Sequence, residues 1–239
     1  MQGYIFKTYI ADGKEYYVTT DSQGRIVETR TVPFPESVVS LLYKNISGWR
    51  DWFGGISAMI DLITPSDAHD TMKDVLEQYD HLTESLAYFE LSKFQWRERI
   101  RQVRRGTGVT TGSALQDESL PTLCDQLLPV QQKLQTLILR VLDMDSSKDS
   151  SLERMVSYYR TLGAESPDVY RFSSCTTNFE LVDENTFAEV LYPETIFDII
   201  DFHVRECVRR EIRFRVCKNC GRYFAVTGHA GVEYCDRVI

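Results

Sequence analysis

The sequence predicts a mainly α-helical protein with small β parts. Through most of the 239 residues, apolar side chains recur at spacings of three and four, which is the period of a helix packed on one face. β-branched and aromatic residues bounded by turn residues occur only near the start of the chain and again before its last helix. We expect four segments: a β meander packed on the body (1–34), a helical body (35–175), a hairpin with an amphipathic helix (176–212), and a zinc-knuckle tail (213–239).

The composition is that of an ordinary globular protein, with 43% hydrophobic and 26% charged residues. No apolar run of 18 residues occurs, so we expect no membrane contact. The first residues lack the pattern of a signal peptide, which predicts a cytoplasmic protein with reduced thiols. The net charge of −8 disfavours a general nucleic-acid coat protein.

The N-terminal segment is expected to form a three-stranded meander. Turn residues at 11–14 and 21–24 separate three runs that are rich in β-branched and aromatic side chains. Pro33 and Pro35 end the last of these runs.

The helical body begins with a short stripe of apolar residues at helical spacing and continues with a long one. After Ser66, a plausible N-cap, no glycine or proline occurs until Gly106. One helix over this stretch would be about 60 Å long, and we expect any bend near Asp80 and His81. Its apolar stripe is interrupted only by Lys93, and it predicts either core packing or a dimer-forming coiled coil. The stripe comprises Met72, Val75, Leu76, Tyr79, Leu82, Leu86, Phe89, Trp96, Ile100 and Val103.

Glycine-rich sequence from 104 to 121 is interpreted as a mobile loop, and it lacks the ending of a phosphate-binding loop. Helices are then predicted from Pro121 to about Met144 and from 152 to 162. A hairpin at 179–191 precedes an amphipathic helix that begins at Pro193.

Three cysteines near the end of the chain carry the clearest chemical signal. Cys217 and Cys220 are separated by two residues and followed by Gly221, which permits the positive φ of a tight turn. A hairpin from Tyr223 to Tyr234, turning at 228–231, would return Cys235 to the pair. Thiolates are the preferred ligands of structural zinc, so Cys217, Cys220 and Cys235 are the predicted metal ligands.

The fourth ligand stays open at this point. His229 is the nearest candidate, and Asp236, Cys207, His203 or a partner chain are alternatives. A redox thiol pair is the competing interpretation, but redox pairs open a helix, whereas a glycine and two aromatics follow here. Three cysteine ligands fit a closed structural site better than a catalytic one, so a structural zinc is expected, and Glu233 is the one possible base that we would test.

Residues 213–237, with Cys-Lys-Asn-Cys-Gly-Arg-Tyr-Phe and Tyr-Cys-Asp-Arg, resemble the C-terminal signature of an uncharacterised bacterial family of unknown function that is common in Firmicutes. The segment is more distantly similar to CGNR-type zinc fingers, which end helical regulatory proteins. Both patterns imply a further cysteine after the one that matches Cys235, and this sequence stops before it, so the tail is either truncated or incomplete. The resemblance implies no activity.

Seven basic residues and two glutamates occupy 205–222, giving this window a charge of +5. Such a stripe beside a zinc knuckle predicts contact with a phosphate backbone, and the alternative is a solvated helix face. We therefore expect an uncharacterised zinc-binding regulator that is not an enzyme and contacts nucleic acid or protein through its tail. A scaffold that dimerises through the long helix, and an enzyme with an unrecognised site, are the alternatives.

Overall fold

The computed structural model describes residues 3–106, 111–116, 120–146, 148–229 and 231–235. The chain divides into two compact units, and the helices α6 and α8 each contribute residues to both. The first, here called the sheet unit, contains Met1–Phe34, Asn45–Leu128 and Cys175–Ile199. The second, here called the cysteine unit, contains Pro35–Lys44, Pro129–Ser174 and Ile200–Ile239.

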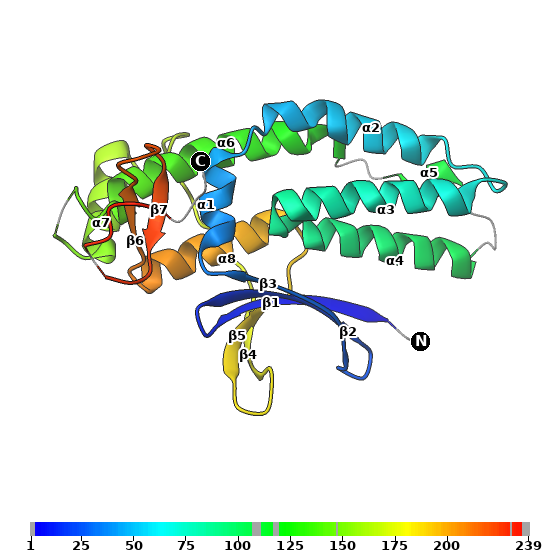
Figure 1. The fold of residues 1–239 in the computed structure, drawn as a ribbon, viewed down its shortest axis with the longest axis horizontal. Helices are drawn as coiled ribbons and strands as arrows, with labels where there is room; N and C mark the ends of the chain where they lie inside the picture. Colours follow the sequence, from blue (N-terminus) through cyan, green and yellow to red (C-terminus); the bar gives the residue numbers. More distant parts are fainter. Residues whose placement is uncertain (1–2, 107–110, 117–119, 147, 230, 236–239) are drawn as a thin grey trace. The chain divides into compact units, whose positions relative to one another are not determined.

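An antiparallel sheet of five strands, in the order β3-β2-β1-β5-β4, forms one layer of the sheet unit (Figure 1). The predicted meander and the predicted hairpin are therefore parts of one sheet, because Thr8 pairs with Leu191 and Tyr9 with Val190. The strands are β1 (Tyr4–Ala11), β2 (Lys14–Asp21), β3 (Ile26–Pro33), β4 (Thr177–Leu181) and β5 (Phe187–Leu191).

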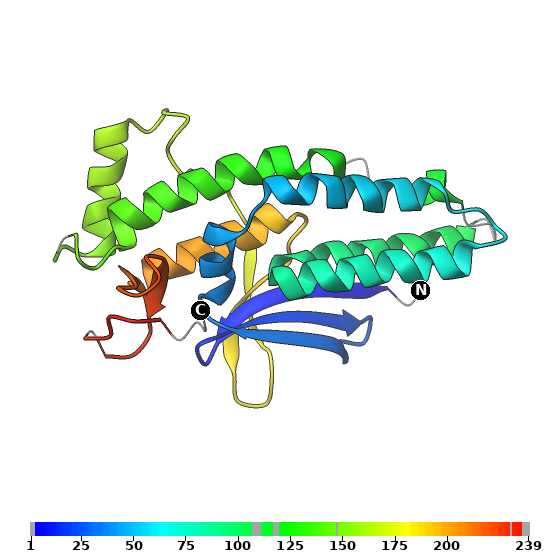
Figure 2. The same ribbon diagram turned by 45° about the horizontal axis from the view of Figure 1, so that its top comes forward.

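Helices cover one face of this sheet. Figures 1 and 2 show α2, α3 and α4 side by side, with α4 next to the sheet. Phe6 of β1 packs on Phe94 of α4 with 5.5 Å between the ring centroids. The helical elements are η1 (Ser47–Trp49), α2 (Arg50–Asp61), α3 (Ala68–Ser85), η2 (Ala87–Phe89), α4 (Glu90–Gly106), α5 (Gly112–Leu115), η3 (Leu120–Thr122) and the part of α6 (Leu123–Leu137) that ends at Leu128.

The long apolar stripe lies on two antiparallel helices rather than one. Helix α3 ends at Ser85, Leu86 has extended backbone angles, and α4 returns alongside α3 after the turn η2. The bend predicted near Asp80 and His81 is wrong, since both residues lie within α3. Most of the stripe is buried within the same chain, so the predicted single long helix and its use as a dimer seam are corrected.

Lys93, which interrupts the stripe, is buried and makes ion pairs. Its Nζ lies 2.6 Å from the Asp80 carboxylate on α3 and 3.4 Å from Glu28 on β3. Glu28 also accepts a hydrogen bond from Arg97. A lysine on the apolar face is tolerated because two carboxylates neutralise its charge.

The segment interpreted as a mobile loop contains ordered structure at 112–115. Gly112 begins α5 and donates its N–H to the carbonyl of Ile63 at 2.8 Å, and Leu115 is buried. Residues 107–110 and 117–119 lie outside the described residues. The loop prediction is therefore wrong for α5.

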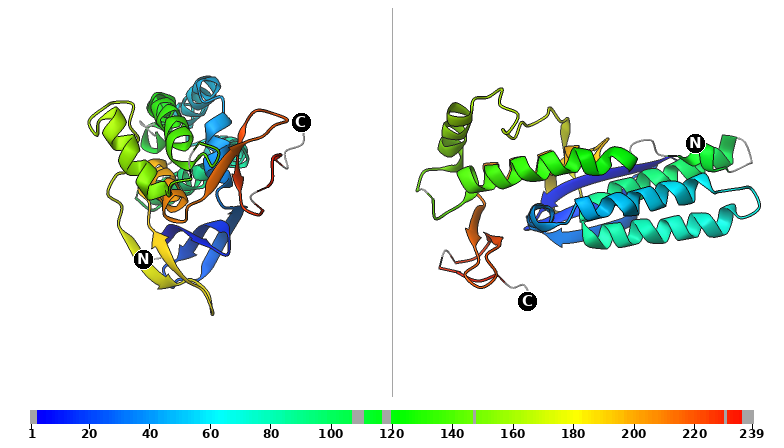
Figure 3. Two further views of the ribbon diagram at one scale, coloured as in Figure 1. Left: turned by 90° about the vertical axis from the view of Figure 1, so that its left-hand side faces the viewer. Right: turned by 90° about the horizontal axis from the view of Figure 1, so that it is seen from above.

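The cysteine unit contains several helices and a small two-stranded hairpin that lies against two of them (Figure 3). Gln131 of α6 donates to the carbonyls of Leu41 and Lys44, which closes the C-terminal end of α1. The elements are α1 (Glu36–Tyr43), α6 from Pro129 onward, the π-helix η4 (Ile138–Leu142), α7 (Ser151–Leu162), β6 (Arg213–Val216) and β7 (Tyr223–Val226), together with the part of α8 (Ile196–Arg209) that begins at Ile200.

The mainly α-helical class, the N-terminal strands and the C-terminal hairpin and helix are confirmed. No described helix combines the length and apolar character that crossing a membrane requires.

Candidate metal centre

The Cys217–Cys220 pair lies in the turn between β6 and β7. The strands pair antiparallel, with Val216 opposite Tyr223. Cys217 donates its N–H to Arg222 O, and Gly221 donates to Cys217 O, each at 2.9 Å. Gly221 has a φ of +69°, which glycine adopts without steric cost. This is the tight turn that the Cys-x-x-Cys-Gly spacing predicts.

Cys235 approaches the pair through an irregular segment. Lys218 N–H donates to Glu233 O at 3.0 Å, and Arg215 Nη1 donates to Val232 O at 3.0 Å. These bonds hold the returning chain against the turn. The predicted return strand at 232–234 is wrong, because β7 pairs with β6 and no described strand occurs after Val226.

The three sulfurs converge. All three Sγ atoms lie within 4.8 Å of one another, and those of Cys220 and Cys235 are 3.6 Å apart. Tetrahedral zinc with Zn–S bonds of about 2.3 Å places its sulfurs about 3.8 Å apart. The cluster is therefore close to that geometry, and a separation of up to 4.8 Å is slightly wider than an ion-bound site would have. Cys217, Cys220 and Cys235 are close enough together to hold a metal ion.

Backbone amides favour the metal-binding form of Cys217. The backbone N–H of Cys220, and then that of Cys235, lower the pKa of the Cys217 thiol to about 6. The Cys235 nitrogen lies 3.4 Å from Cys217 Sγ. A thiolate, rather than a thiol, is the ligand that zinc binds. The turn thus stabilises the negative charge that a metal needs.

No fourth Cys, His, Asp or Glu among the described residues joins the three sulfurs. His229, the nearest predicted candidate, is exposed, and Cys207 and His203 are buried within α8. Burial lowers the pKa of His203 to about 3, so this imidazole is neutral and part of the core. Asp236 lies outside the described residues.

Glu233, an acidic neighbour of Cys235 in the described part of the chain, is paired elsewhere. Its Oε1 lies 2.5 Å from Lys218 Nζ, and its carboxylate is outside the metal-binding cluster. The described residues therefore place no carboxylate at the three sulfurs.

The hairpin that carries the cysteines is built into the core of the cysteine unit. Phe214 is fully buried, and its carbonyl accepts a hydrogen bond from Met144 N–H at 2.9 Å. Tyr223 Oη donates to Asp143 Oδ2 at 2.9 Å. The sequence reasoning missed Asp143, since it lies about 70 to 80 residues before these partners and no local pattern links them.

The basic residues of the predicted stripe are engaged by neighbouring groups, although only some of these groups carry a negative charge. Arg215 makes two hydrogen bonds to Asp145, at 2.9 and 3.0 Å. The buried carboxylate of Glu206 accepts from both Arg209 and Arg210 at 2.8 Å. The remaining basic residues contact carbonyls, carboxylates or rings: Arg205 with Ser173 O, Arg213 with Asp149 O, Lys218 with Glu233 and Arg222 with the Tyr43 ring.

Comparison with known proteins leaves the site to be interpreted from its own geometry. No family model, curated protein or solved structure matches the chain.

Proposed function

We propose that the chain is a zinc-binding protein in which Cys217, Cys220 and Cys235 hold one structural ion. The observation that carries this proposal is the convergence of three sulfurs, brought from two segments to within 4.8 Å. Three thiolates select zinc over magnesium or calcium, which prefer oxygen ligands. A fourth ligand would come from solvent, from a partner or from outside the described residues.

The proposed metal would join the β6–β7 turn to the segment that ends at Cys235. The contacts that hold that segment include a backbone bond from Lys218 to Glu233, a bond from the Arg215 side chain to the Val232 carbonyl and the Lys218–Glu233 ion pair. Metal coordination supplies folding free energy in such small modules. The ion would therefore fix the returning chain rather than activate a substrate.

We further propose that the protein is a regulator rather than an enzyme, with a protein as its partner. The similarity of the cysteine segment to zinc fingers that end helical regulatory proteins supports this class. Arg215 and Lys218 pair with Asp145 and Glu233, and Arg209 and Arg210 share the Glu206 carboxylate, so these side chains are held within the protein and part of the positive charge that nucleic-acid contact would need is offset.

Metal analysis of the full chain purified without chelator tests the zinc proposal. We expect about one zinc per chain in the native protein and a large loss in Cys217→Ser. Glu233→Ala is the matched control, because its side chain pairs with Lys218 outside the sulfur cluster, and it should retain the metal. Absence of metal from the native protein, or equal loss in Glu233→Ala, would contradict a site formed by the three cysteines.

The choice of partner is tested with fluorescently labelled single-stranded RNA and DNA at several salt concentrations. We expect no salt-dependent binding. Tight binding that weakens steeply with salt would show phosphate contacts and would overturn the protein-partner proposal.

A further inference from the structure

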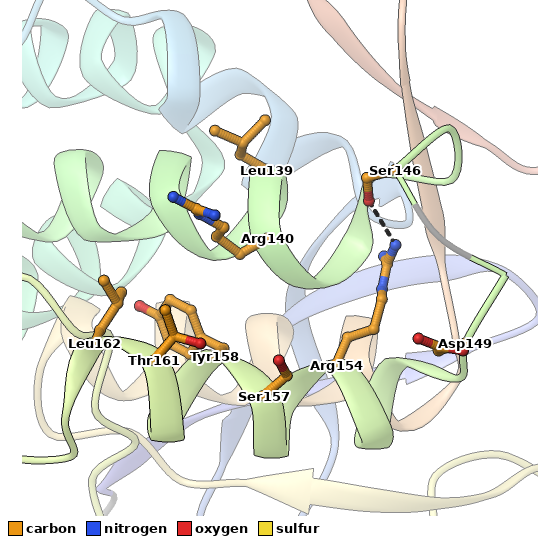
Figure 4. A pocket seen from close by; sticks show the side chains of 9 residues that line it. All are labelled: Leu139, Arg140, Ser146, Asp149, Arg154, Ser157, Tyr158, Thr161 and Leu162. Carbon is orange, nitrogen blue, oxygen red and sulfur yellow. Dashed lines mark hydrogen bonds between the residues drawn. The ribbon is translucent and has the colours of Figure 1, made fainter.

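A groove between the π-helix η4 and helix α7 lies within the cysteine unit, apart from the sulfur cluster (Figure 4). Its volume is about 530 Å³, which is within the range of pockets that hold small molecules. Residues of α7 three or four positions apart form one wall, and Leu139 and Arg140 of η4 are also among the lining residues. Ser146 and Asp149 line the end of the groove near Arg154.

Arg154 makes this end of the groove rigid. Its guanidinium is buried and donates to the carbonyls of Val141 and Asp143, where η4 ends. It also donates to Ser146 Oγ at 2.8 Å. Asp149 is the only carboxylate that lines the groove, and it lies close enough to Arg154 to stabilise its charge. Burial and the nearby Arg213 lower the pKa of Arg154, and the carboxylates of Asp143 and Asp149 partly offset this effect.

The Arg140 side of the groove carries hydrogen-bond donors with no partner among the described residues. Arg140 is exposed and makes no ion pair or side-chain hydrogen bond within the described chain. The hydroxyls of Ser157 and Thr161, on the facing wall, also have no side-chain partner in the described part of the chain. Figure 4 shows Arg140 on η4 opposite Tyr158, Thr161 and Leu162. A cation and two hydroxyls thus line the groove, and the one carboxylate among its described lining residues, Asp149, lies at the Arg154 end.

We propose that this groove binds a small organic anion with a phosphate or carboxylate head. The head would accept hydrogen bonds from Arg140, Ser157 and Thr161, since guanidinium donors form their strongest hydrogen bonds with such oxyanions. Leu139 and Leu162 provide apolar surface for the body of the ligand. The buried Tyr158 closes the floor, and its hydroxyl is held by Tyr170 N–H at 2.8 Å. An uncharged molecule would leave the positive charge of Arg140 without an opposite charge.

Calorimetric titration of the full chain tests the proposal with phenyl phosphate and benzoate, which share an aromatic body and differ in the head group. We expect saturable binding of at least one, and the stronger of the two identifies the head that the groove prefers. Benzyl alcohol, which lacks the charge, should bind much more weakly. Arg140→Gln should weaken binding about tenfold or more, and Ser157→Ala with Thr161→Val should weaken it as well.

The matched control is Arg160→Gln, which removes an exposed arginine of α7 that does not line the groove. It should bind the anions as the native chain does. All substituted side chains are exposed, so unchanged circular dichroism should accompany every variant. Lack of saturable binding of both anions, unchanged affinity in Arg140→Gln, or equal affinity for benzyl alcohol would each overturn the proposal. None of these outcomes depends on the metal content measured for the cysteine site.

Discussion

The phenol of Tyr223 donates a hydrogen bond to the Asp143 carboxylate at 2.9 Å, and this contact attaches the cysteine hairpin to the end of η4. Burial and the bond to Asp143 raise the pKa of Tyr223, so the phenol remains protonated and continues to donate. Asp143 is itself buried. The position of the cysteines therefore depends on a polar contact between two residues that are far apart in the sequence.

Tyr223→Phe should destabilise the cysteine unit by about 1–3 kcal/mol, because the buried Asp143 carboxylate loses a donor. Hydrogen exchange of the β6 and β7 amides would measure this loss. Tyr234→Phe is the control, since it removes an exposed hydroxyl from the same module and should have little effect. Equal effects of the two substitutions would show that the bond to Asp143 is unimportant.

Gly112→Ala should destabilise the sheet unit by about 1–3 kcal/mol. An added Cβ would lie 2.2 Å from the Ile60 carbonyl oxygen, which is backbone and cannot move aside easily. Gly106→Ala is the control, because its Cβ would meet open space. All three tryptophans lie in the sheet unit, so denaturation followed by tryptophan fluorescence reports on it. A neutral Gly112→Ala would contradict the close packing of α5 on α2.

Lys93→Ala should destabilise the sheet unit by about 1–3 kcal/mol, whereas Lys93→Met should be nearly neutral. Both substitutions remove the ion pairs to Asp80 and Glu28, whose carboxylates are half exposed and can be solvated by water. Alanine also leaves a space on the buried face of α4, whereas methionine fills it. The same tryptophan fluorescence would measure both variants. If Lys93→Met were as damaging as Lys93→Ala, the ion pairs rather than the packing of the lysine stem would hold α4 to its neighbours.

Stability should fall in mild acid partly through His203. Burial lowers the pKa of this imidazole to about 3 from 6.5, so below pH 6.5 the unfolded chain binds a proton that the folded chain does not. Stability is therefore fully present above pH 6.5 and decreases as the pH falls, by up to about 1.4 kcal/mol per pH unit.

His203→Leu should flatten this pH dependence, as measured by denaturation at a series of pH values with circular dichroism. His81→Gln is the control, because His81 is exposed and its replacement should leave the slope unchanged. An unchanged slope in His203→Leu would show that other groups cause the acid sensitivity.

Local patterns in the sequence predicted many of the helices and strands and the cysteine turn, but they missed α5 and predicted a strand at 232–234 that does not form. The spacing of apolar residues identified α3, α4 and α8, although not the reversal at Leu86, which no glycine or proline marks. The Cys-x-x-Cys-Gly spacing identified the turn, and Gly221 has the positive φ that this turn requires. These features depend on residues a few positions apart, where side-chain period and backbone sterics act.

Only the tertiary structure decided which distant residues meet. The pairing of Thr8 with Leu191 joins two predicted β segments into one sheet, and the bond from Tyr223 to Asp143 anchors the cysteine hairpin. The structure likewise shows that Lys93, which interrupts the apolar stripe of α3 and α4, and Arg209, Arg210 and Arg215 of the basic stripe are paired with carboxylates. The sequence shows the charges, but the pairing of charges depends on distance in space, which the chain acquires only when its helices and strands have packed.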